Sequence, residues 1–167
     1  MTKSTEQLLI ALTREYEMYQ EYLELAKKKK TTIIEGNVKE LDNITKIEQN
    51  MIIGLGKIDQ IRTAIVGNVL YEKQVQRVEN ITELANYLED TAKEKVLELK
   101  EKLTVLLDEI RNVNEINSKL LKQSLEYIDF NLNLVTSINK EPKGSTYGNK
   151  ADEKKPAEST YVFDAKV

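Results

Sequence analysis

Side chains that could perform catalysis are restricted in this sequence. The 167 residues include neither histidine nor cysteine, which excludes a thiol nucleophile, an imidazole acid or base, a disulfide and a zinc site with the usual ligands. Glutamates are numerous, and inward-facing glutamates of a helical bundle could bind two irons, but that type of site needs Glu-x-x-His spacings. The sequence therefore predicts a protein that is not an enzyme and holds no metal or cofactor.

One short glycine-rich segment resembles a phosphate-binding loop. The residues GLGK occupy positions 54 to 57. The full motif needs an earlier glycine where this chain has Met51, and a serine or threonine for the metal where it has Ile58. Nucleotide binding is therefore not predicted.

The charge distribution limits the possible partners. The net charge is -3 with a pI near 5.3, and basic residues alternate with acidic ones, which argues against nucleic acid. The run Lys27 to Lys30 has two interpretations, a patch for a membrane or an acidic partner, or a solvated helix face. No segment approaches the roughly 18 to 20 apolar residues of a spanning helix, and the N-terminus does not resemble a signal peptide. We expect a cytoplasmic location without stable membrane insertion.

Apolar residues spaced by three and four predict two long helices joined by a tight turn. The first helix is expected over about 5–35 and the second over 37–66. Gly36 suits a left-handed C-terminal cap, and Asn37 with Glu40 has the spacing of a capping box. Gly54 and Gly56 each cost about 1 kcal/mol in a helix interior, so the second helix is expected to be soft or bent there.

A third, very long helix is expected after a crossover. Residues 67–80 show no sustained period, a short helix is expected over 81–89, and the third helix over 91–139. Residues 140–167 contain both prolines and no apolar period, which predicts a disordered tail ending in the apolar patch Tyr161 to Phe163. The predicted fold is all-α, an antiparallel helical hairpin plus one long third helix, with a domain over 1–139 and a tail over 140–167.

The C-terminal half of the third helix is too apolar to face water on all sides. Residues 93 to 112 include ten charged side chains, whereas residues 120 to 139 include three. At about 1.5 Å per residue, the third helix would be about 73 Å long against about 45 Å for each arm of the hairpin. Part of it must extend beyond the hairpin and be covered by the returning segment, another copy or another protein.

These considerations give a predicted partner-binding site on residues 114 to 132. Leucine and isoleucine would anchor an incoming amphipathic helix, while asparagine and serine would fix its register or merely tolerate partial exposure. The predicted residues are Asn114, Asn117, Leu120, Leu121, Ser124, Leu125, Ile128, Asn131 and Leu132. A structural coiled-coil subunit that self-associates through the same face is the alternative.

The run INSKLLKQSLEYIDFNLNLV, preceded by LLDEIRNVNE, resembles the C-terminal helix of the FlgN family of flagellar export chaperones. The opening LLIALTREYEMYQEYLELAKKKK, followed by IIEGNVKELDNI, is also similar to that family, and the resemblance covers roughly residues 5–139. It implies a cytoplasmic chaperone of the flagellar type III export pathway. Such a protein would bind the terminal helices of the hook-filament junction proteins, prevent their premature assembly and deliver them to the export gate or ATPase components.

Overall fold

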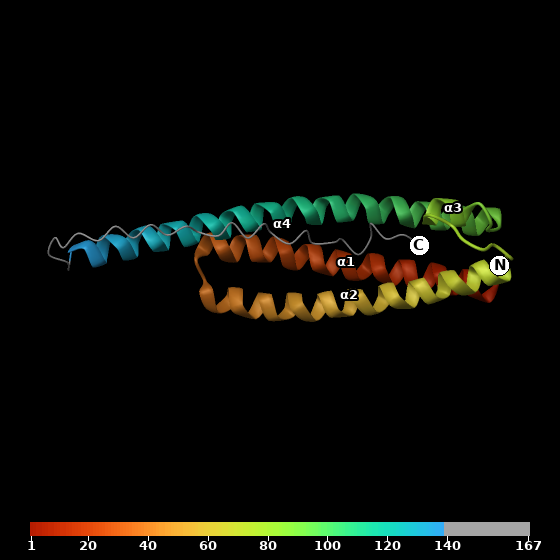
Figure 1. The fold of residues 1–167 in the computed structure, drawn as a ribbon, viewed down its shortest axis with the longest axis horizontal. Helices are drawn as coiled ribbons and strands as arrows, with labels where there is room; N and C mark the ends of the chain where they lie inside the picture. The colour runs from red at the N-terminus through yellow and green to blue at the C-terminus, as the bar shows by residue number, and fades with distance from the viewer. Residues whose placement is uncertain (139–167) are drawn as a thin grey trace.

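The computed structural model describes residues 1–138, and all four of its elements are helices (Figure 1). They are α1 (Lys3–Glu35), α2 (Val38–Glu72), α3 (Ile81–Ala85) and α4 (Asp90–Ile138). The predicted all-α class, with three long helices packed as a bundle, is confirmed. The predicted tail at 140–167 lies outside the described residues.

The turn between α1 and α2 has the capping chemistry expected from its sequence. Gly36 adopts a left-handed conformation with φ of 68°, which costs glycine little because it has no Cβ. The Asn37 side chain then accepts a hydrogen bond from the backbone N–H of Glu40 at 3.1 Å. The two helices therefore reverse direction with a single residue, Asn37, standing between Gly36 and the start of α2.

Helix α2 passes through its glycines and continues six residues beyond the expected end at 66. Gly54, Gly56 and Gly67 all lie within one continuous helix. Its last turns are held by packing, since Val66 and Val69 are 4% and 0% exposed, and tertiary burial of this kind outweighs weak local propensity. The crossover is correspondingly shorter than the expected 67–80.

Helix α3 is a single short segment that covers one end of the bundle. The Asn80 side chain caps it by accepting from the Glu83 N–H at 2.9 Å, and the Glu83 carboxylate accepts from the Glu79 N–H at 2.6 Å. Ile81 and Leu84 are buried in the core. The helix ends at Ala85 rather than at the expected residue 89, and α4 begins at Asp90.

Helix α1 is the central element of the bundle. It packs along its length on both α2 and α4, and α3 packs on α4. Figure 1 shows α1 and α4 running in the same direction, with α2 antiparallel to both. The core joins all four helices and includes Leu8, Leu12, Tyr19, Tyr22, Leu23, Leu55, Val66, Val69, Leu84, Val96, Leu103 and Ile110.

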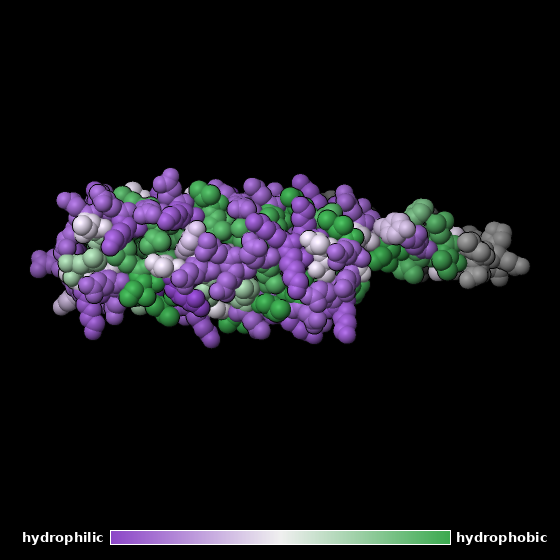
Figure 2. Space-filling view, turned by 180° about the vertical axis from the view of Figure 1, so that it is seen from behind, coloured by the Kyte–Doolittle hydropathy of each residue, from purple (hydrophilic) through white to green (hydrophobic). Residues whose placement is uncertain are grey.

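Helix α4 extends beyond the hairpin, as expected from its length (Figure 1). Asn117 lies beside Ala26, and the same offset of 91 positions along the chain brings Glu35, the end of α1, level with residue 126. We call residues 125–138 the overhang, which spans about 20 Å at about 1.5 Å per residue. Figure 2 shows apolar residues gathered on this projecting end, whereas polar residues cover much of the bundle.

Candidate partner-binding site

The core-facing stripe of α4 continues without a break along the overhang. Within the bundle, the buried positions Leu103, Leu106, Ile110 and Asn117 are separated by three, four and seven residues. Steps of four and three lead on to positions 121, 124, 128, 131 and 135, which therefore share that side of the helix. We call this set, together with the flanking Leu125 and Leu132, the in-line face.

The in-line face becomes solvent-exposed once α1 ends. Leu121, Ser124 and Asn131 are partly exposed. Leu125 is 62% exposed, Ile128 51%, Leu132 57% and Val135 59%. These leucine, isoleucine and valine side chains occupy positions that would be packed against α1 if α1 were longer. The exposed apolar surface is thus the core stripe of a helix whose neighbour has stopped.

The polar residues of the predicted site have different surroundings. Asn117 is only 2% exposed, and its side-chain N–H donates to the Ala26 carbonyl of α1 at 2.9 Å. The Ser124 hydroxyl donates to the Leu120 carbonyl of its own helix at 2.9 Å. Asn114 and Asn131 are partly exposed. In the free protein, Asn117 thus joins α4 to α1, and Leu125, Ile128 and Leu132 are the predicted residues most open to a partner.

Ion pairs anchor the hairpin tip below the overhang, and they involve the lysine run predicted from the sequence. Lys27 lies 3.2 Å from Glu109 of α4, and Lys28 lies 2.7 Å from Glu40 of α2. The hydrogen bond to Glu109 is the largest influence raising the pKa of Lys27. These contacts support the solvated-face interpretation of the run for these two lysines.

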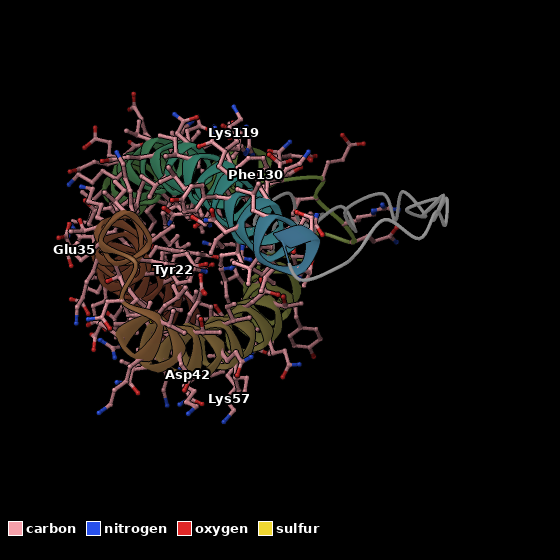
Figure 3. All side chains as sticks on the ribbon, turned by 90° about the vertical axis from the view of Figure 1, so that its left-hand side faces the viewer. Tyr22, Glu35, Asp42, Lys57, Lys119 and Phe130 are labelled. Carbon is pink, nitrogen blue, oxygen red and sulfur yellow. The ribbon has the colours of Figure 1, made fainter. Side chains whose placement is uncertain are left out.

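Lys29 takes part in a more protected pair. It lies 2.7 Å from Glu48, whose carboxylate also accepts a hydrogen bond from the Tyr22 hydroxyl at 3.0 Å. The side chains of Lys29 and Glu48 are 16% and 14% exposed. Figure 3 shows Tyr22 between the helices. Ion pairs therefore join the C-terminal end of α1 both to α4 and to α2, and they stabilise the part of the bundle from which the overhang projects.

A buried charged cluster between α1 and α2 was not predicted from the sequence. Glu15 and Arg62 are 1% and 5% exposed, with Arg62 Nε 3.2 Å from Glu15 Oε2. Arg62 also pairs with Asp59 one turn earlier. Burial raises the pKa of Glu15 although Arg62 opposes the shift, and burial together with the Glu15 charge raises the pKa of Tyr19 to about 12.

A sequence signal for this cluster did exist. Glu15 lies between Leu12 and Tyr19 on the apolar seam of α1, so a charge at that position needs a partner. The cluster faces the helix interface rather than a cavity. No group of histidine, cysteine, aspartate and glutamate able to hold a metal occurs among residues 1–138, and no helix there is long and apolar enough to cross a membrane.

These features define a class of helical binding protein, in which a long helix offers an exposed apolar face beside a rigid hairpin. The chain matches the sequence model of the family described as "FlgN protein" over residues 1–155. It belongs to the FlgN family, the flagellar export chaperone for hook-associated proteins, which is not a family of enzymes. Searches of curated proteins and of solved structures gave no significant match.

Proposed function

We propose that the in-line face binds an amphipathic terminal helix of a hook-filament junction protein. The observation that supports this most directly is the continuity of the α4 core stripe beyond the end of α1. Leu125, Ile128 and Leu132 act as the apolar anchors, and Leu121 and Leu120 extend the contact toward the bundle. A bound helix would take the place that a longer α1 would occupy.

The energy available from this face suits a reversible complex. Fully burying an aliphatic side chain yields about 1.5–3 kcal/mol. Leu125, Ile128, Leu132 and Val135 are each half to two-thirds exposed, so covering all four contributes on the order of 4–5 kcal/mol. The loss of translational and rotational freedom on association offsets part of this gain. A partner held in this way can be released again.

The proposed role follows from masking and release. Terminal helices of proteins that assemble outside the cell are aggregation-prone while they wait for export, since their apolar faces lack partners. Binding in the cytoplasm covers those faces, prevents premature assembly, and brings the client to the export gate or the ATPase components.

A pair of charge substitutions tests the proposal. Ile128→Glu places a carboxylate on the in-line face, while Val105→Glu makes the same change at a position of α4 that is 64% exposed but lies outside this face. Binding of a purified hook-filament junction protein is measured by calorimetry. We expect at least a tenfold loss of affinity for Ile128→Glu, about 1.4 kcal/mol, and no change for Val105→Glu.

Two further measurements complete the test. Thermal melts followed by circular dichroism should be the same for both variants, because both sites are exposed. Unchanged client binding by a folded Ile128→Glu variant would refute the assignment. Sedimentation at low concentration addresses the self-association alternative: a very tight homodimer that ignores the junction proteins would favour a structural subunit over a chaperone.

A further inference from the structure

Helix α4 has a second apolar surface, which runs from the end of the bundle onto the overhang and which the client site does not use. Ile116, Tyr127, Phe130 and Leu134 are 40%, 68%, 60% and 46% exposed. They are separated by eleven, three and four residues, which places them along one side of α4. We call this set the lateral face. In Figure 3, which looks along the bundle, Phe130 lies on the same outer side of α4 as Lys119, away from α2.

The lateral face and the in-line face cannot be covered by one helix. At about 100° per residue, their centres are roughly 120° apart around α4, whereas a docked helix covers a stripe of about 100°. The charged residues Lys122, Glu126 and Asp129 occupy the remaining side. A client on the in-line face therefore leaves two aromatic rings of the lateral face in water.

The C-terminal residues of the chain have the chemistry and the reach to cover these rings. Twenty-nine residues follow Ile138, and they carry the apolar segment Tyr161 to Phe163 near their end. The chain has only two phenylalanines, one at 130 and one at 163. In an extended backbone, residues 161 and 163 would point to the same side, and their rings would then form a pair able to stack on Tyr127 and Phe130.

The length of the connection fits this contact. Twenty-two residues separate Ile138 from Tyr161, and a flexible chain of that length has a root-mean-square span of about 26 Å. Along α4, Phe130 lies about 12 Å back from Ile138. Pro142, Gly144, Gly148 and Pro156 disfavour a helix in the connection. An extended occupant is therefore expected, and it suits the lateral face better than a site shaped for a helix.

We propose that Tyr161 to Phe163 packs in cis against the lateral face of the overhang. The contact covers Tyr127 and Phe130, and it leaves the in-line face open for a client. Covalent connection gives the two partners an effective concentration in the millimolar range, so even a weak aromatic contact is populated. The assignment of the other face to the client rests on the proposed function, whereas the cis contact does not.

A spin label tests the contact without any client. Because the natural chain has no cysteine, Ala165→Cys introduces one labelling site two residues beyond Phe163. In an isotope-labelled full-length chain carrying a nitroxide there, we expect strong attenuation of the amide signals of overhang residues such as Tyr127 and Leu134. Signals around Leu12, deep in the bundle, should be unaffected.

Matched substitutions identify which face is occupied. Phe130→Ser should abolish the attenuation, while Ile128→Ser, on the in-line face and similarly exposed, should leave it in place. Absence of attenuation in the starting protein, or loss with Ile128→Ser rather than Phe130→Ser, would overturn the proposal. A mixing experiment tests for contact between two chains: one carries the spin label and no isotope, and the other carries the isotope and no spin label. Equal attenuation in that mixture would also overturn the proposal, because the tail would then contact a second copy of the protein. Loss of client binding leaves each of these readouts unchanged.

Discussion

Replacing Arg62 by methionine tests whether the attraction between Glu15 and Arg62 offsets the cost of burying their charges. The two side chains of the central pair are 3.2 Å apart and almost fully buried. At that distance and an effective dielectric constant of about 20, their attraction is about 5 kcal/mol, most of which offsets the cost of removing both charges from water. Arg62→Met removes the attraction and leaves the cost of burying Glu15. We expect a loss of about 3–5 kcal/mol in the free energy of unfolding at pH 8.

The loss should depend on pH in a defined direction. Burial already raises the pKa of Glu15, and Arg62 is the influence that lowers it, so Arg62→Met raises it further. A carboxyl group whose folded pKa exceeds its unfolded value contributes stability that is complete below the unfolded pKa and is lost as pH rises through the folded pKa. At pH 4.5 or below, a neutral Glu15 needs no cation. The defect of Arg62→Met should then be much smaller than at pH 8.

Urea unfolding followed by circular dichroism at pH 4.5 and pH 8 measures both values. The matched control is the double variant Glu15→Leu/Arg62→Met, which removes both buried charges and should regain most of the lost stability at pH 8. An equal loss of unfolding free energy for Arg62→Met at both pH values would show that Glu15 and Arg62 do not compensate each other. A double variant no more stable than Arg62→Met at pH 8 would show the same.

Three further predictions concern individual positions. Tyr19→Phe should hardly change the free energy of unfolding at pH 7. Because the folded pKa of Tyr19 is about 12, the parent should lose about 2 kcal/mol of unfolding free energy relative to the variant as pH rises from 10 through 12. Urea unfolding across that range measures the difference, and parallel pH dependences of the two proteins would contradict the prediction. Gly36→Ala should lower stability by about 1 kcal/mol because φ at this position is 68°. Gly56→Ala should raise stability by about 0.5–1 kcal/mol, because Gly56 lies in a helix interior with nothing within 4 Å of an added Cβ. Thermal melts that shift in the same direction for both variants would contradict the role of Gly36 as a left-handed cap. Asn117→Leu loses the bond to Ala26 but gains apolar burial, so we expect a Tm equal to or above that of the parent, and a fall of several degrees would show that the amide stabilises the bundle.

Sequence periodicity was sufficient to predict the three long helices. It was least reliable for the helix ends that are determined by packing against other helices. The turn at Gly36 and Asn37 could be predicted because its chemistry is local. The end of α2 could not be predicted. Gly67 suggests a helix end in the sequence, but the burial of Val66 and Val69, which only the structure shows, holds the helix together past that glycine. Local propensity is worth about 1 kcal/mol at a glycine, less than burying a single valine.

In the candidate site, too, features set by the local sequence could be predicted, whereas features set by packing between helices could not. The excess of apolar surface at the end of α4 followed from counting charges and lengths, and its exposed residues Leu125, Ile128 and Leu132 were among those predicted to bind a partner. The role of Asn117 did not follow, because which residue of α1 lies beside it depends on the register of two helices 91 positions apart. The partnership of Glu15 with Arg62 depends on a second such register, between α1 and α2.

The overhang also sets a gradient of local stability along α4. A segment of about fourteen residues is marginal as an isolated helix in water, so the overhang owes its helical form to being continuous with the packed turns before it. Its backbone amides should exchange with solvent fastest toward Ile138 and slowest near Leu103, which is fully buried. Capture of a partner would then suppress fraying at the end of the helix, and part of the binding energy would appear as added helical order in the chaperone itself.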